Sequence, residues 1–257
     1  MPGPASLASD TVALVIAAGA CARVAAAVTV ATLPAFPGVS VRGRIACAAA
    51  LAAVAVPMAI DAGSAAVGGW PLVVLGEAIV GGVFGTAIAL VVGAAGWAGA
   101  LLGSVSGLSW ADDFDPVGDG ESAGIARLAW WMGAAAFLAA GGQAAVVAGL
   151  LDSLRSMPVG TALVGGGFAD GLVTLAFTAP TAALSLALTL ALPALAAVVA
   201  FHLASAICLR TVPFSPGSGL LQGLAAVVLL AALGCGLDAW AGTAGTLMHA
   251  ALERLVR

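Results

Sequence analysis

The chain has 257 residues, of which 62% are hydrophobic and 8% are charged, and its formal net charge is −4. A soluble domain usually carries about 25% charged residues, so this composition excludes a soluble globular core. It also excludes a disordered chain, which needs low hydrophobicity, and a nucleic-acid-binding protein, which needs a basic surface. We therefore predict an all-α fold, that of a polytopic helical membrane protein in contact with lipid.

Six apolar stretches follow one another along the chain, each long enough, or nearly so, for a helix that spans a bilayer. They cover residues 11–33, 45–60, 71–102, 125–151, 168–209 and 219–237. The third and fifth are too long for one perpendicular span, and Pro180 and Pro193 lie inside the fifth. We therefore expect long kinked helices or helical hairpins there. We expect a single domain over residues 1–257, which could consist of two helical halves, 1–158 and 159–257.

The clearest charged side chains inside these stretches are Arg23 in the first and Glu77 near the start of the third. Ionisable side chains at membrane depth are costly and therefore informative. One interpretation is an ion or proton pathway. The other is structural pairing, within the chain or with a partner subunit, or snorkelling of each side chain to the interface. We favour structural pairing.

A cluster of acidic side chains separates the third stretch from the fourth. The segment contains Trp110, Asp112, Asp113, Phe114, Asp115, Pro116, Asp119 and Glu121. Its carboxylates do not have the spacing of an EF-hand calcium loop, so we predict no metal site there. Two interpretations stay open, a solvated turn and a functional loop that lines or closes a passage.

Sequence signals for enzymatic chemistry are nearly absent. Residues 103–107 (GSVSG) resemble the serine-hydrolase elbow, but valine occupies the position of the nucleophile. His202 and His249 stand alone, and the four cysteines show no CxxC spacing. We therefore expect no catalytic residues, no metal site, no cofactor and no disulfide framework.

Several motifs occur in order between residues 75 and 160. They are LGEAIVG at 75–81, a Gly- and Ser-rich run at 96–109 followed by Phe114-Asp115-Pro116, FLAAGG at 137–142, and DSLRSMPVG at 152–160. In this order and spacing they resemble the FliR/SctT family, the single-copy subunit of the type III protein export gate. Arg23 with Pro34, and the basic turn at 42–44, are similar to the family more loosely. The last third departs from the family pattern, because residues 214–217 (FSPG) stand where the family has a P-Q-x-N-type run.

The resemblance implies a set of partners and a location. Family members join FliP/SctR-type and FliQ/SctS-type membrane subunits, and other export apparatus components, around a narrow pore for unfolded flagellar or effector proteins. The location is the bacterial inner (cytoplasmic) membrane, at the flagellar basal body or the injectisome base, and the motif spacing favours the flagellar version. By the same resemblance, residues 110–121 are the candidate pore plug. The candidate polar contacts, within the membrane or between subunits, are Arg23, Glu77, Arg127 and Gln143.

A small secondary transporter or channel is the alternative function. In that interpretation Glu77 and Arg23 line the permeation pathway. Transporters of this kind favour a detectable repeat between the two halves, with broken helices at matching positions. The sequence shows no convincing repeat, so we favour the export-gate interpretation.

Overall fold

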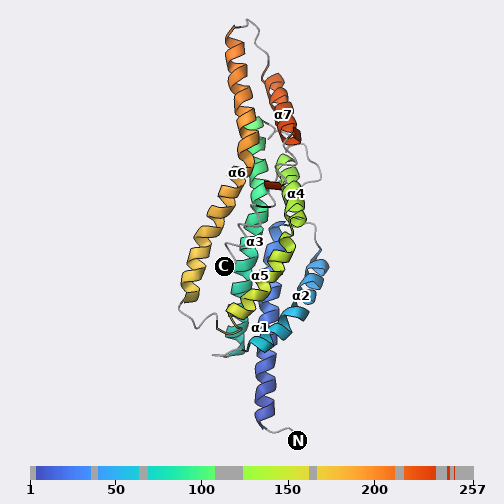
Figure 1. The fold of residues 1–257 in the computed structure, drawn as a ribbon, viewed down its shortest axis with the longest axis vertical. Helices are drawn as coiled ribbons and strands as arrows, with labels where there is room; N and C mark the ends of the chain where they lie inside the picture. Colours follow the sequence, from blue (N-terminus) through green and yellow to red (C-terminus); the bar gives the residue numbers. More distant parts are fainter. Residues whose placement is uncertain are drawn as a thin grey trace. The chain divides into compact units, whose positions relative to one another are not determined.

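The computed structural model describes residues 4–35, 40–63, 69–107, 124–161, 167–211, 217–235, 242–243 and 246. Within these residues all regular structure is helical, which confirms the predicted all-α class (Figure 1). The helices are α1 (Pro4–Ala35), α2 (Val41–Ala62), α3 (Trp70–Ser106), α4 (Gly124–Ala139), α5 (Gly142–Ser156), α6 (Gly167–Thr211) and α7 (Ser218–Cys235).

Four of these helices are long and apolar enough to cross a membrane. The apolar spans are Thr11–Ala31 in α1, Val41–Ala62 in α2, Trp70–Ser106 in α3 and Phe177–Arg210 in α6. The pair α4 and α5 would form a fifth, broken span. By length and composition, the chain is therefore a polytopic membrane protein.

The fourth predicted stretch is two helices rather than one. The break lies at Gly141, whose φ of +79° is in the left-handed region that favours glycine. The Gly141 N–H donates to the carbonyl of Leu138 at 3.0 Å, which closes the last turn of α4. At Gly142, the ring of Phe137 occupies the space that a Cβ would need. Glycines at these two positions therefore let the chain leave α4 and begin α5 at once.

The fifth predicted stretch is one long helix, α6, and not a hairpin. Pro180 and Pro193 both lie within its 45 residues. Proline removes one backbone donor, but a helix can continue past it when the surrounding packing compensates. The same holds for Pro57 in α2. The N-cap of this helix is Ser40, whose hydroxyl accepts from the Gly43 N–H at 3.3 Å.

The helices form two compact units. The described residues of the first unit come from Met1–Leu90 and Gln143–Pro180, and those of the second from Val91–Gly142 and Thr181–Ala250. Both α3 and α6 contribute to each unit. The division into halves 1–158 and 159–257 stays a prediction.

The core of the first unit brings α1, α2, α3 and α5 together. Its buried residues are Ile16, Ala20, Val24, Ala27, Val28, Ala55, Ala59, Val73, Leu150, Leu154 and Val159. Many of these side chains are small, and small side chains let helices approach closely where lipid removes the hydrophobic drive for association. In Figure 1 these helices lie alongside one another. This unit contains Arg23 and Glu77, the clearest charged residues inside the predicted apolar stretches.

Candidate functional site

Arg23 and Glu77 meet in the core of the first unit. Arg23 projects from α1 and Glu77 from α3, and both side chains are 0% exposed. On α1, Arg23 lies next to Val24 on the same face as Ala20 and Ala27, three and four positions away, which are buried too. Full burial of a charged residue is almost never seen unless the charge is paired.

Arg23 is paired through every N–H of its guanidinium. Its Nε donates to Glu77 Oε2 at 2.6 Å, and Nη2 lies 2.5 Å from the same oxygen. Nη1 donates to the Ser153 carbonyl at 2.8 Å and to the Ser153 hydroxyl at 3.3 Å. Nη2 also donates to the Met157 carbonyl at 2.9 Å. Because a guanidinium has five N–H groups, these five contacts leave none unused.

The position of the Ser153 and Met157 carbonyls explains why a positively charged side chain is favourable at Arg23. Ser153 lies in the last turn of α5, and Met157 directly follows that helix. The last carbonyls of a helix have no helical partner and carry its partial negative charge. Arg23 therefore caps the C-terminal end of α5 from the neighbouring helix α1.

Glu77 completes the arrangement with the opposite polarity. Its Oε1 accepts from the backbone N–H of Gly160 at 3.0 Å, while Oε2 receives Arg23. Gly160 has a φ of +90°, in the left-handed region that favours glycine. We name residues 157–160 the Met157–Gly160 turn. The Thr161 N–H donates to the Pro158 carbonyl at 3.2 Å and closes this turn.

Three glycines allow the surrounding segments to converge. A Cβ at Gly81 would lie 2.8 Å from the carbonyl carbon of Arg23 and 2.9 Å from its Cα. A Cβ at Gly85 would lie 2.5 Å from the Ala27 carbonyl oxygen, and one at Gly19 would lie 2.5 Å from Val159 Cγ1. The backbones of α1 and α3 therefore touch directly beside the ion pair, as small residues permit in membrane helices.

The chemistry of this arrangement is that of a structural lock. The two charges cancel, neither side chain is exposed, and the guanidinium has no donor left for water or a ligand. A proton relay would need an acceptor or donor that is open to a neighbouring group. Breaking a buried pair by removing one partner typically costs about 3–5 kcal/mol, because the remaining charge is uncompensated.

The other residues predicted for the site lie elsewhere. Arg127 is exposed in the first turn of α4, and Gln143 is exposed in the first turn of α5. The whole candidate plug falls outside the described residues: Trp110, Asp112, Asp113, Phe114, Asp115, Pro116, Asp119 and Glu121. Its predicted role stays a prediction.

The start of the segment that leads to the candidate plug is defined in the second unit. There α3 ends at Ser106, which is 1% exposed, and is followed by Gly107 with a φ of +74°. A Cβ at Gly107 would lie 3.2 Å from Cγ of Gln222 on α7. The C-terminal end of α3 therefore finishes in a turn at Gly107, and the side chain of Gln222 on α7 packs against this glycine.

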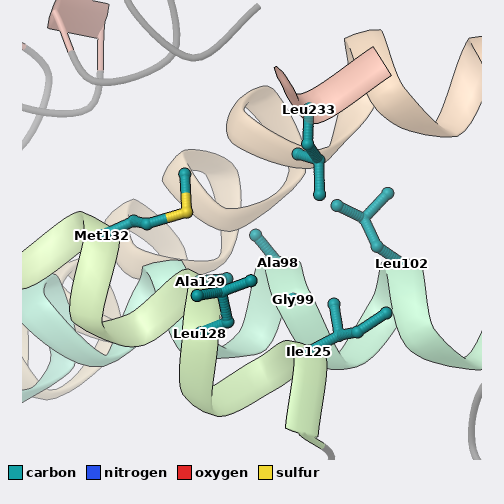
Figure 2. Close-up of a pocket in the computed structure, with 8 residues that line it drawn as sticks. All are labelled: Ala98, Gly99, Leu102, Ile125, Leu128, Ala129, Met132 and Leu233. Atoms are coloured by element: carbon teal, nitrogen blue, oxygen red, sulfur yellow. The ribbon is translucent and has the colours of Figure 1, made fainter. Parts of the chain in front are cut away.

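A small pocket lies in the second unit between α3, α4 and α7 (Figure 2). It is lined by Ala98, Gly99, Leu102, Ile125, Leu128, Ala129, Met132 and Leu233. All of these side chains are apolar, whereas ligand sites combine an apolar lining with a few polar groups that orient the ligand. We interpret this pocket as a packing gap beside the close contact between Gly99 and α4.

A metal or disulfide site does not emerge from the part of the chain that the structure describes. No group of three or more His, Cys, Asp or Glu residues there could hold a metal ion. The four cysteines, Cys21, Cys47, Cys208 and Cys235, are exposed and form no disulfide bond.

Sequence reasoning identified Arg23 and Glu77 but assigned no role to Ser153, Met157 or Gly160. Four of the six contacts around the pair involve main-chain groups or a hydroxyl rather than a charge. Main-chain groups have no signature in residue identity. The motif at residues 152–160 contains all three residues, and the glycine that follows Pro158 by two positions marks a turn, but neither signal indicates a contact with Arg23 or Glu77.

The comparison with known families matches nearly the whole chain. A family model described as "Bacterial export proteins, family 1" matches residues 14–249. The matched range contains the ion pair and the Met157–Gly160 turn, and it extends from α1 to beyond α7. No curated protein matches the chain. The chain therefore belongs to the FliR/SctT family of bacterial export proteins and is a component of a type III export apparatus.

Proposed function

We propose that the chain is the single-copy subunit of a type III protein export gate. With FliP/SctR-type and FliQ/SctS-type membrane subunits it would form the pore for unfolded flagellar or effector proteins. The observation that carries the proposal is the family match over residues 14–249. The described part of the chain also contains four helices that are long and apolar enough to span a membrane. The subunit acts without catalytic chemistry and without a cofactor, because its task is to form a passage.

The proposed location is the bacterial inner membrane, at the base of a flagellum or an injectisome. The motif spacing of the sequence favours the flagellar system. Other export components would supply the energy, and unfolded proteins would be the substrates. The apolar exposed faces of the helices would meet lipid or the partner subunits, since charged residues are few on them.

The acidic segment 110–121 is the proposed plug of this pore. A segment with five carboxylates within ten residues is costly to place in lipid, so it must face water or protein. The Gly- and Ser-rich end of α3 leads into it, and a segment that opens on demand needs such a connection. This part of the proposal depends on the family resemblance.

Native mass spectrometry of the co-expressed complex tests the proposal. The tagged chain would be purified in mild detergent together with the products of neighbouring genes. We expect one copy of this chain bound to several copies each of two small helical membrane proteins. A lone monomer or homodimer, obtained with those partners present, would contradict the export-gate function. In that case a transporter would be considered again, although the closed Arg23–Glu77 pair offers it no open polar path.

A further inference from the structure

We propose that Arg23 and Glu77 form a polarity-specific latch that holds the Met157–Gly160 turn in place. In this role both are positioning residues for the connection that leads from α5 to α6. The inference does not depend on the pore function, because every contact that carries it lies within the first unit of this chain.

The latch recognises two main-chain groups of opposite polarity. Arg23 donates to the Met157 carbonyl at 2.9 Å, at one end of the turn. Glu77 accepts from the Gly160 N–H at 3.0 Å, at the other end. A guanidinium can only donate, and an ionised carboxylate can only accept. The direction of the pair is therefore fixed by the turn as well as by the mutual attraction of the charges.

The side chain between these two anchors is itself seated in the core. Val159 is 1% exposed, and its Cγ1 occupies the space that a Cβ at Gly19 would need. The Cβ position at Gly19 is also 3.2 Å from Glu77 Cγ and 3.5 Å from Val73 Cγ1. The turn therefore places the side chain of Val159 between α1 and α3. The ion pair binds the main chain on both sides of this residue, at Met157 and at Gly160.

The latch differs from an ordinary buried salt bridge in the substitutions that it tolerates. An ordinary pair survives exchange of its two charges, and it can often be replaced by apolar residues without loss of stability. The latch survives neither change. After exchange, a carboxylate would face two carbonyls and a guanidinium would face an N–H. After apolar replacement, the protein would keep its packing, but the turn would lose both main-chain partners.

The accessibility of Val159 provides the readout. The full chain, in detergent, would first have its exposed cysteines replaced by alanine (Cys21→Ala, Cys47→Ala, Cys208→Ala and Cys235→Ala). One background then carries Val159→Cys as the reporter. A second carries Val198→Cys, a position in the second unit that is also 1% exposed. The rate of maleimide labelling measures how often each buried position opens.

Three changes are then compared in both backgrounds: Glu77→Gln, the exchange Arg23→Glu with Glu77→Arg, and the apolar pair Arg23→Met with Glu77→Met. We expect each to accelerate labelling at position 159 by about tenfold or more, because an uncompensated or absent partner frees the turn. Labelling at position 198 should stay within about twofold, because that position belongs to the second compact unit and local opening occurs in separate cooperative units. Ser153→Ala is the matched control. Of the contacts to Arg23 it removes only the one at 3.3 Å and leaves the carbonyl contact at 2.8 Å, and its other loss is a hydrogen bond to the Leu150 carbonyl within α5.

Three results would overturn the latch. Slow labelling at position 159 in the charge-exchanged protein would show that the pair is an ordinary salt bridge. Equal acceleration at positions 159 and 198 would mean that the whole chain loosens. Unchanged labelling in all three variants would show that the turn stays in place without the ion pair. If Glu77→Gln does not fold, Arg23→Lys replaces it, because lysine keeps the charge with three donors where five are used.

Discussion

Replacing Gly81 with alanine should force α1 and α3 apart beside the ion pair. The new methyl group would lie 2.8 Å from the carbonyl carbon and 2.9 Å from the Cα of Arg23, and closer still to its carbonyl oxygen. Carbon atoms pack best at about 3.5–4.0 Å, so the two backbones would have to separate by about 1 Å. Main-chain atoms cannot rotate out of the way as the end of a side chain can.

The expected cost follows from this overlap. Overpacking a filled interior typically costs about 1–3 kcal/mol. Alanine also gains about 0.5–1 kcal/mol over glycine inside a helix, which partly offsets the loss. Gly82→Ala isolates the two terms, because nothing lies within 4 Å of a Cβ at that neighbouring position of the same helix. The difference between Gly81→Ala and Gly82→Ala should therefore equal the overpacking term, about 1–3 kcal/mol.

The assay is reversible unfolding of the purified chain in mixed micelles, followed by the fluorescence of its six tryptophans. Gly81→Ala should unfold at a clearly lower denaturant concentration than the unaltered chain, and Gly82→Ala at an equal or higher one. Equal midpoints for the two variants would refute the direct contact between the backbones of α1 and α3. Loss of stability in both would point to a general intolerance of side chains on α3.

Three further predictions follow from the same features. Gly99→Ala should destabilise the second unit, because its Cβ would lie 2.6 Å from Ala129 Cβ. Gly93→Ala should leave the stability unchanged, because nothing lies within 4 Å of a Cβ there, and the unfolding midpoints of the two variants test the difference. Glu77→Ala should cost about 3–5 kcal/mol of unfolding free energy, while Arg155→Ala, which breaks a surface pair at 3.5 Å, should cost less than about 1 kcal/mol, and similar losses would contradict the burial argument. Deletion of residues 112–121 should make cells leak ions or small molecules, as dye uptake would show, and a tight membrane with normal export would refute the plug.

Hydropathy along the sequence predicted the helices well because membrane spans depend mainly on apolar length. The stretch at 71–102 corresponds to α3, and the stretch at 219–237 corresponds to α7. The break at Gly141 escaped prediction, because a glycine in an apolar helix can continue the helix or end it, and only its φ of +79° decides. The hairpin alternative for residues 168–209 failed for a related reason, since prolines in membrane helices often leave the helix continuous.

The site could be predicted only in part. Arg23 and Glu77 could be identified because a charge inside an apolar stretch needs a reason. Their mutual contact spans 54 residues of sequence, and no local pattern encodes such a distance. The partners at Ser153, Met157 and Gly160 contribute mostly main-chain atoms, which any residue type supplies.

The distribution of polar and apolar groups indicates how such a subunit can associate with others. Within the first unit the charges of Arg23 and Glu77 are fully used by the chain itself. On α7 the exposed side chains Leu220, Leu224 and Val227 are apolar and follow one face at helical spacing. In lipid, apolar side chains gain little from leaving the hydrocarbon, so association depends on close packing of small residues. Inside the chain, the glycines beside the ion pair provide this close packing and fix α1 against α3. Contacts with partner subunits would need the same kind of close packing on the outer surface of the helices.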